Sequence, residues 1–508
     1  MNRINYILGL AIISIAGVAV RIAYIMPPAA LEGDAAVFGL IAKHISEAKE
    51  FPIYMWLAHY SGTLVSYIGA VLFKWWGVSA FNFLSVSAIA SIMWAFAVLW
   101  LSRMLFGKEG RLAAFFWAMF PPATAFFYIM DMSNANTGGL FFGTLIICIL
   151  FGWKGGGFSK GFLNPFSLGL CAGIGMWLSP AMMPFILTTI SALYVYGKNK
   201  ISLRAILYLI FGFVIGYCPA IIYNLQYPGA SFTRMAGRIL NLDRSLFSTP
   251  NFAHIVISQA LWRVSTIPAS LGMLPGLIIQ MAGLLNTAIF FAGVGAVILR
   301  GFKKSEKDEY TENFKILLIF ILWFVLFYAI LVGENRTRFM VPLAVVMPLF
   351  IGKILFDLCL RSRFLYIVLF LSLISVNFYS LNGIFFNRHI PAYSKVSDWL
   401  GSNGIAWAFS DYDSAYAIVF DSKERIMASP TLFHPKFADR RPEYTEKVRE
   451  TAEFAYIINK DRYPGSAPAV ARKLKSLGVD FRVKTIEDFC VYYALSKRIY
   501  PEELGLKE

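Results

Sequence analysis

The stretch PPAALEGDAAVFGLIAKHI, residues 27–45, opens a loop that runs to about residue 80 and decides how the chain is organised. An apolar run over about residues 6–26 precedes it and is long enough to cross a bilayer. Apolar residues then recur at helical spacing over about residues 35–46, which predicts a helix lying on a membrane surface. Glu32 and Asp34 therefore stand where the chain leaves the membrane.

Asp34 is compatible with two roles. A carboxylate at this boundary faces lipid on one side and water on the other, which suits a base acting between a lipid-borne substrate and a soluble one. Asp34 also directly precedes the predicted helix, where its oxygens can cap backbone N–H groups. The two roles can coexist, and position alone does not separate them.

The composition indicates an α-helical polytopic membrane protein. Of 508 residues, 58% are hydrophobic and 15% are charged, against about 25% charged in soluble domains. The five cysteines show neither metal-ligand spacing nor an evident disulfide pattern. Apolar runs over the first 390 residues predict about eleven spans. They are about 5–26, 80–103, 111–129, 138–153, 164–179, 181–197, 203–224, 275–299, 315–333, 339–359 and 364–383.

The net charge of +16 does not indicate nucleic-acid binding, because of where it lies. From Pro391 onward, 18 Lys and Arg face 17 Asp and Glu, so the excess sits in the loops of the first 390 residues. Loops between spans carry such an excess on the inner face of a membrane.

The segment SGTLVSYIGAVLFKWW, residues 61–76, tests the topology. It is short for a span and contains Lys74, so we predict a second surface helix with interfacial tryptophans. The basic loop around residues 103–111 then lies inside with the N-terminus. An odd number of spans puts the C-terminal region on the outer face.

The composition changes at about Pro391. Charges become dense, apolar runs shrink to strand length, and helical patterns lie between them at about 392–402, 440–452 and 466–477. This alternation predicts two parts, a membrane domain over residues 1–390 and a small extracytoplasmic α/β domain over residues 391–508. We expect the second domain to carry no catalytic residues.

Several polar residues share the expected outer face with Asp34 and are candidate site residues. They are Asp131 in loop 130–139, Arg234 and Arg238 in loop 225–274, Arg336 and Arg338 in loop 333–339, and His44 and His59 beside Asp34. Asp131 is either a helix cap or a partner of Asp34 for a metal or an acceptor hydroxyl. Each histidine is either structural or a ligand.

Arg336 and Arg338 stand two residues apart at the mouth of a span. Arginine binds phosphate through two parallel hydrogen bonds, so the pair suits a phosphate group. The alternative is that both side chains merely reach out to the membrane interface. Positive charge is disfavoured on the outer face, which favours the phosphate interpretation.

These segments together resemble the GT-C superfamily of membrane glycosyltransferases, in the protein-mannosyltransferase and aminoarabinose-transferase branch. The resemblance covers roughly residues 1–380 and rests on the order and spacing of several segments. They are EGDAAVFGLIAKHI at the first loop, YSGTLVSYIGAVLFKWWGVS at a second surface helix, SRMLFGKEGRLAAFFWAMFPP at the inside loop and third span, and NRTRFMVPL near residue 340.

The resemblance implies transfer of a sugar from a polyprenyl-phosphate donor to an acceptor on the outer face of a bacterial-type plasma membrane. It implies Asp34 as the base, Asp131 as a second acidic residue, and Arg336 or Arg338 on the donor phosphate. Glu32 and the His59-Tyr60 pair, which stands where the aminoarabinose transferase has Glu-Lys, are further candidates for substrate binding. Metal dependence varies in the superfamily, so a divalent metal stays open.

Two other functions fit the same features. A transporter or flippase of a lipid-linked saccharide would also need an apolar bundle, although transporters more often bury charges within their spans. A non-catalytic subunit of envelope polysaccharide assembly would need no intact acidic site. Conversion of the donor to free polyprenyl phosphate distinguishes the enzyme from both.

Overall fold

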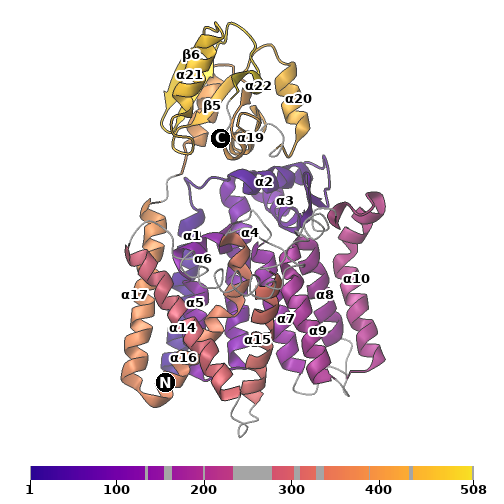
Figure 1. Cartoon of the computed structure of the whole chain (residues 1–508), viewed down its shortest axis with the longest axis vertical. Coiled ribbons are helices and arrows are strands. Elements are labelled where there is room, and N and C mark those ends of the chain that lie inside the picture. The colour runs from indigo at the N-terminus through magenta and orange to yellow at the C-terminus, as the bar shows by residue number, and fades with distance from the viewer. Residues whose placement is uncertain are drawn as a thin grey trace, which may run out of the picture.

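The computed structural model describes residues 2–131, 136–153, 163–197, 201–232, 277–301, 309–327, 337–387, 390–433 and 439–505. A helical bundle forms one end of the molecule and a small region built on a sheet forms the other (Figure 1). The bundle helices are α1 (Arg3–Ile25), α4 (Ala80–Arg103), α5 (Lys108–Met119), α6 (Ala123–Met130), α7 (Asn136–Gly152), α8 (Leu163–Leu178), α9 (Met183–Gly197), α10 (Leu203–Gln226), α14 (Leu277–Gly301), α15 (Glu309–Phe327), α16 (Met347–Arg361) and α17 (Arg363–Asn387). Short 3-10 helices η2 (Pro180–Met182) and η4 (Thr337–Val345) precede α9 and α16.

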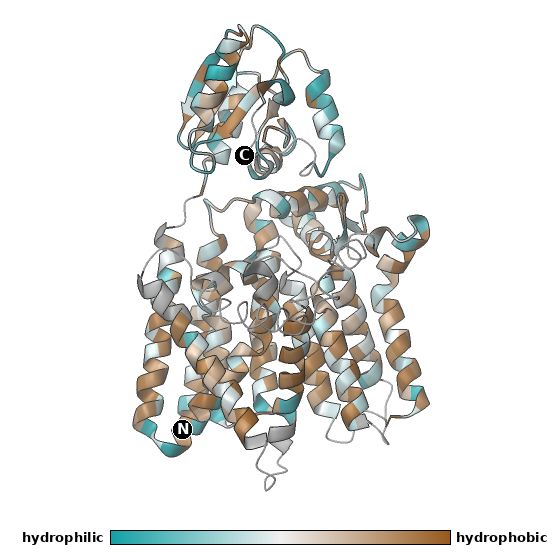
Figure 2. Cartoon of the chain, viewed as in Figure 1, coloured by the Kyte–Doolittle hydropathy of each residue, from teal (hydrophilic) through white to brown (hydrophobic). Residues whose placement is uncertain are grey.

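The bundle confirms the predicted polytopic membrane protein. Five helical segments among the described residues are long and apolar enough to cross a membrane, and six shorter apolar helices accompany them. Apolar residues dominate the bundle, and hydrophilic ones are more frequent in the C-terminal region (Figure 2). The predicted span 111–129 is wrong in one respect. It breaks after Met119 because Pro121 and Pro122 cannot continue a helix, so α5 and α6 replace it.

Glycines let two of the helices approach closely. A Cβ on Gly173 of α8 would lie 2.4 Å from the Phe213 carbonyl oxygen of α10, and one on Gly212 would lie 2.1 Å from the Phe166 carbonyl oxygen. No other residue fits at such backbone distances, which is the packing expected from the glycine-rich spans.

Arg21 ties three helices together inside the bundle. Its side chain is fully buried in α1. Its Nε donates to Ser91 Oγ of α4 at 2.7 Å, and its Nη atoms donate to the carbonyls of Met119 at 2.8 Å, Ala118 at 3.2 Å and Gly17 at 3.1 Å. Hydrogen bonds from a charged group to buried acceptors of this kind hold α1, α4 and α5 in one arrangement.

Two helices of the first loop lie across the end of the bundle, beneath the C-terminal region (Figure 1). They are α2 (Gly33–Ser46) and α3 (Leu64–Trp76), joined by the hairpin of β1 (Tyr54–Met55) and β2 (Ala58–Gly62). The helix α3 confirms the predicted second surface helix, and its Trp75 and Trp76 are exposed.

The helix α2 lies in the first loop as predicted, but protein covers both of its sides. Nearly every residue from Gly33 to His44 is buried, including Lys43 and His44. One face packs on α3, and the other is covered by helix α19 (Tyr412–Asp421) of the C-terminal region. A Cβ on Gly39 would lie 2.8 Å from the Phe420 ring, so the two helices touch directly. The apolar positions that suggested a lipid-facing helix face protein instead.

The C-terminal region has the predicted strand–helix alternation. Strands β3 (Trp407–Phe409), β4 (Met427–Ser429), β5 (Ala455–Asn459), β6 (Arg482–Ile486) and β7 (Phe489–Tyr493) form one sheet in the order β4-β3-β5-β7-β6. The first three strands are parallel, and β7 is antiparallel to both neighbours. The helices are α18 (Tyr393–Ser402), α19, α20 (Pro442–Glu450), α21 (Ser466–Ser476) and the short α22 (Pro501–Leu504). The sequence interpretation did not include α19, the helix that covers α2.

Candidate active site

Asp34 lies in the first turn of α2, directly under the C-terminal region. Its side chain is 16% exposed. The hydroxyl of Tyr412, the first residue of α19, donates a short hydrogen bond to Asp34 Oδ1. Arg440 places Nη2 at 3.5 Å from the same carboxylate oxygen and Nε at 3.2 Å from the Tyr412 oxygen. One carboxylate, one hydroxyl and one guanidinium therefore meet at a single point between the two parts of the chain.

The charges at this point shift the pKa values of the groups that meet there. Burial raises the pKa of Tyr412, and the Asp34 charge raises it further, well above the ordinary value. Burial alone would lower the pKa of Arg440, but Tyr412 and Asp34 outweigh it and raise that pKa. Tyr412 is therefore a neutral hydrogen-bond donor and Arg440 a permanent cation at physiological pH.

Glu32 lies beside Asp34 and binds the C-terminal region through Arg462. Arg462 Nη2 lies 3.1 Å from Glu32 Oε2, and its Nη1 contacts Asp413 and lies 3.7 Å from Asp411 Oδ1. Burial raises the pKa of Asp413 to about 6, although Arg462 opposes the shift. The structure thus gives Glu32 a role in docking the two parts.

His59 and Tyr60 lie on β2 and reach different neighbours. His59 Nδ1 shares a hydrogen bond of 2.5 Å with the hydroxyl of Tyr223 on α10, and the two rings stack. Burial lowers the pKa of His59, so its ring is neutral near pH 7. Tyr60 is half-buried and close enough to Arg440 to raise that residue's pKa. Tyr60 therefore belongs to the surroundings of Asp34.

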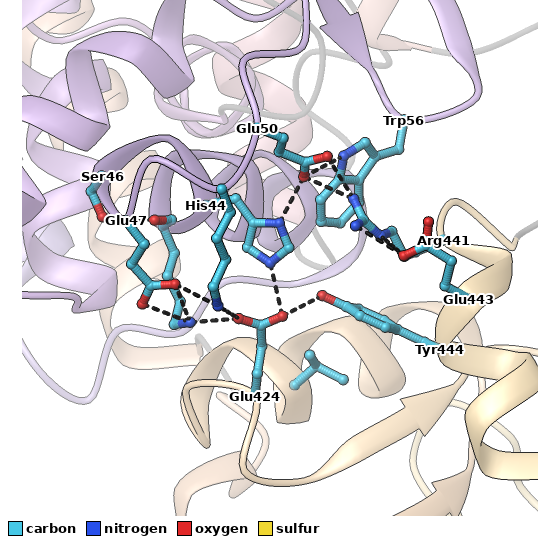
Figure 3. A network of polar contacts seen from close by, with 12 residues as sticks. His44, Ser46, Glu47, Glu50, Trp56, Glu424, Arg441, Glu443 and Tyr444 are labelled. Carbon is cyan, nitrogen blue, oxygen red and sulfur yellow. Dashed lines mark hydrogen bonds and ion pairs between the residues drawn. The ribbon is translucent and has the colours of Figure 1, made fainter.

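His44 lies in a network of ion pairs between α2 and the C-terminal region (Figure 3). Its Nδ1 is 2.7 Å from Glu50 Oε1, and its Nε2 is 2.8 Å from Glu424 Oε1. Ionised carboxylates only accept hydrogen bonds, so both ring nitrogens donate and the ring is an imidazolium. Burial alone would lower the pKa of His44, but the two carboxylates outweigh it and raise that pKa.

Two further cations hydrogen-bond to the carboxylates of this network. Lys43 Nζ binds Glu424 Oε2, and Arg441 Nη1 binds both oxygens of Glu50 at 2.8 and 2.9 Å. Tyr444 donates to Glu424 Oε1 at 2.6 Å. The residue pair Lys423 and Glu424 follows α19 with left-handed backbone angles, φ 54° and 65°, which bulky residues rarely adopt. From this turn the Glu424 carboxylate reaches Lys43 and His44 of α2, so the network docks the C-terminal region.

The structure describes only some of the other predicted site residues. Asp131 follows α6 as its C-cap residue and is half-buried. Arg338 lies in η4, which packs against α6 and α7. Arg234, Arg238 and Arg336 lie outside the described residues. The structure thus places Tyr60 near Asp34, Glu32 and His44 in contacts that dock the C-terminal region, and His59 against α10.

Tyr412 and Arg440 are the site residues that sequence reasoning missed. One local pattern pointed to α19, because Asp411 in DYDSAYAIVF is followed by apolar residues at helical spacing. Its Oδ1 accepts from the Ser414 N–H at 3.1 Å, as an N-cap does. The pattern predicts a helix start, but nothing in it predicts contact with Asp34.

The described residues contain no group of three or more His, Cys, Asp or Glu side chains placed to hold a metal ion. A metal site involving Asp131 would also draw on the neighbouring residues 132–135, which lie outside the described part of the chain.

No protein-family model and no curated protein sequence matches the chain. Solved structures do match it. ArnT from Cupriavidus metallidurans bound to undecaprenyl phosphate is 10% identical, with a TM-score of 0.59 over 96% of this chain and 98% of that chain. The chain has the fold of the GT-C membrane glycosyltransferases.

A second group of structures supports the same fold. The archaeal oligosaccharyltransferase AglB from Archaeoglobus fulgidus, in complex with an inhibitory peptide and a dolichol-phosphate, is 13% identical with a TM-score of 0.52, over 97% of this chain and 74% of that chain. Its apo form is 14% identical with a TM-score of 0.53, over 93% and 71%. At these identities the likeness establishes the fold alone, so function has to be argued from the site.

Proposed function

We propose that the chain transfers a sugar from a polyprenyl-phosphate donor to an acceptor hydroxyl, with Asp34 as the base. The observation that carries the proposal is the position of Asp34. In a fold shared with a protein that binds undecaprenyl phosphate, Asp34 lies where the bundle meets the C-terminal region and accepts a hydrogen bond from a hydroxyl group. An acceptor hydroxyl would have to make the same hydrogen bond to lose its proton.

The proposed step balances with the chain's own groups. The acceptor oxygen bonds to the anomeric carbon, the bond from that carbon to the phosphate oxygen breaks, and the polyprenyl phosphate leaves with the electron pair. The acceptor proton passes to Asp34. Negative charge grows on the leaving phosphate, so a cation beside it lowers the barrier.

We assign the donor phosphate to Arg336 or Arg338, with Arg234 and Arg238 as further candidates, and Asp131 as a second acidic residue near the acceptor. The acceptor is a lipid, a glycan or a protein. The C-terminal region, proposed as a domain over residues 391–508, then lies on the outer face of a bacterial-type plasma membrane. These assignments follow from the family resemblance and the expected topology.

The base is tested with purified protein and a panel of undecaprenyl-phosphate sugars, with envelope lipids and glycans as acceptors and free undecaprenyl phosphate measured by mass spectrometry. We expect Asp34→Asn to lower turnover by about a hundredfold or more. The matched control is Glu47→Gln, a partly exposed carboxylate at the other end of α2. Turnover of Asp34→Asn close to the wild-type rate, in correctly folded protein, would overturn the assignment.

The phosphate assignment has its own test. Replacing the contacting arginine by Ala should weaken donor binding about ten- to a hundredfold, because a charge-assisted hydrogen bond contributes roughly 1.5–3 kcal/mol. Replacement by Lys should weaken it less, since the charge stays and only the forked geometry is lost. Binding of a polyprenol without phosphate is the control. If Arg336→Ala and Arg338→Ala both bind the donor as wild type does, the phosphate lies elsewhere.

A further inference from the structure

The Tyr412 hydroxyl holds a chemically specific position. It donates to Asp34 Oδ1, and its oxygen accepts from Arg440 Nε at 3.2 Å. A hydroxyl that is about to be deprotonated needs this arrangement, with its proton on the base and its oxygen held by a positioned donor. The phenol of the C-terminal region thus has the hydrogen bonds that the proposed reaction requires of an acceptor.

There is little room beside Asp34 for a second hydroxyl while Tyr412 is in place. The side chains of Asp34 and Arg440 are only 16% and 17% exposed. A Cβ built on Gly33 would lie 2.1 Å from Asp413 Oδ1 and 3.4 Å from the Tyr412 ring, so α19 presses on the backbone next to the base. Gly33 has φ +50°, which glycine tolerates best. A second hydroxyl can take this place on Asp34 Oδ1 only after Tyr412 moves.

We propose that Tyr412 is a placeholder for the acceptor hydroxyl. The phenol occupies the position of the acceptor hydroxyl, and the acceptor displaces it and takes over its hydrogen bonds to Asp34 and Arg440. This inference rests on the proposed function of Asp34. It makes Arg440 a positioning residue and puts one wall of the acceptor subsite on the C-terminal region, at a point formed by α2 and α19.

The placeholder is suited to leave without undocking the whole region. Separate contacts fasten α2 and the residues flanking it to the C-terminal region. They are Arg462 on Glu32, Arg441 on Glu50, and Glu424 on Lys43 and His44. The Phe420 ring also lies against Gly39, and its centroid is 6.2 Å from the centroid of the Phe73 ring. A change confined to the Tyr412 hydroxyl leaves these contacts intact.

A purely structural contact is the rival explanation, and one substitution separates the two. Tyr412→Phe removes the hydroxyl and keeps the ring, whose centroid lies 5.2 Å from that of Tyr416 and 5.8 Å from the guanidinium carbon of Arg440. The matched control is Tyr416→Phe, on the same helix. The Tyr416 hydroxyl accepts from the N–H groups of Arg440 and Arg441 at 2.6 and 3.1 Å, within the C-terminal region.

The first readout is the reactivity of Asp34 toward a water-soluble carbodiimide with glycine ethyl ester, measured by peptide mass spectrometry with Glu47 as internal reference. Loss of a hydrogen bond to a charged group should raise the labelling rate of Asp34 by about tenfold or more in Tyr412→Phe. Tyr416→Phe should leave it unchanged. The second readout uses water as the acceptor and follows release of undecaprenyl phosphate from the donor. Release should rise in Tyr412→Phe and vanish in the double variant with Asp34→Asn.

The proposal stands only if both readouts rise in Tyr412→Phe alone. Unchanged labelling overturns it. Equal labelling of Tyr412→Phe and Tyr416→Phe also overturns it, because the hydroxyl would then only support docking. A rise in labelling without a rise in water-dependent release shows shielding of Asp34 and no acceptor subsite.

Failure of the proposed function has a different signature, namely wild-type turnover by Asp34→Asn, and the labelling readout does not depend on turnover. If Tyr412→Phe fails to fold, Gly33→Ala provides the second variant. Its Cβ would lie 2.1 Å from Asp413 Oδ1 and 3.4 Å from the Tyr412 ring, so it pushes these side chains away from Asp34 while the Tyr412 hydroxyl is kept, and labelling of Asp34 should also rise. Unchanged labelling there would contradict the proposal.

Discussion

Glu424→Gln should weaken the docking of the C-terminal region on α2. The Glu424 carboxylate, 10% exposed on its side chain, accepts from Lys43 and from His44 Nε2 at 2.8 Å across the interface. Both cations are buried, with side-chain exposures of 7% and 5%. Two hydrogen bonds from charged donors at the lower end of roughly 1.5–3 kcal/mol each contribute about 3 kcal/mol. That corresponds to about a 150-fold change in the docking equilibrium.

The assay is hydrogen exchange of the α2 amides followed by mass spectrometry. Because α2 is buried on both sides, its amides exchange only after the C-terminal region lifts and the helix frays, so their rates follow the opening equilibrium. Glu443→Gln is the control, since that side chain is 65% exposed and its ion pair with Arg441 should change the rates about fivefold at most. If amide exchange in α2 is accelerated by less than about tenfold in Glu424→Gln, the reasoning is refuted. Equal acceleration of amide exchange in α8 would also refute it.

Docking of the C-terminal region on α2 should be strongest between about pH 4.5 and 6.5, as measured by hydrogen exchange of the α2 amides. Despite burial, carboxylates hold the pKa of His44 above its ordinary 6.5, so its contribution is complete below that value and is lost as pH rises through the raised pKa. Its partners Glu50 and Glu424 have pKa values lowered below their ordinary 4.5, so their contribution is present above that value and is lost as pH falls through the lowered values. Arg21→Leu should destabilise the bundle by about 3 kcal/mol or more, because it leaves buried hydrogen-bond acceptors unpaired. Arg103→Leu is the control and should not destabilise the bundle, because Arg103 is exposed. Thermal unfolding in detergent measures the stability of both variants. Gly173→Val should lower the unfolding temperature by separating α8 from α10, and an unchanged temperature would contradict the close approach.

The bundle was largely predictable because the bilayer imposes it. Apolar length located α1, α4 and α10, and Lys74 with the basic loop after α4 separated the surface helix α3 from the spans. The predicted span 111–129 failed at Pro121 for a local reason. Hydropathy alone does not detect this break, because the apolar run continues through it. Periodicity identified α2 as a helix but could not say whether lipid or protein covers it, because both demand the same apolar face.

The candidate site was only half predictable for a related reason. Asp34 could be identified from its own surroundings, because Glu32 and Asp34 are the first carboxylates after the first span. Tyr412 and Arg440 could not, because they belong to a segment with ordinary composition and reach Asp34 through tertiary packing. His44 shows the same limit, since its two carboxylate partners come from different parts of the chain. The expectation of a C-terminal domain without catalytic residues came from reading that region separately, and the contacts of Tyr412 and Arg440 with Asp34 show that it lies directly against the candidate base.

The burial of α2 beneath α19 also determines when this contact can form during biosynthesis. The two sides of the Asp34–Tyr412 contact are 378 residues apart in the chain. At ~5–20 residues per second, the ribosome makes the second side roughly 20 to 75 s after the first. During that interval the apolar face of α2 has been translated and its final cover has not. We therefore expect nascent chains that stop before α19 to be strong substrates for membrane quality control, even with every span inserted correctly.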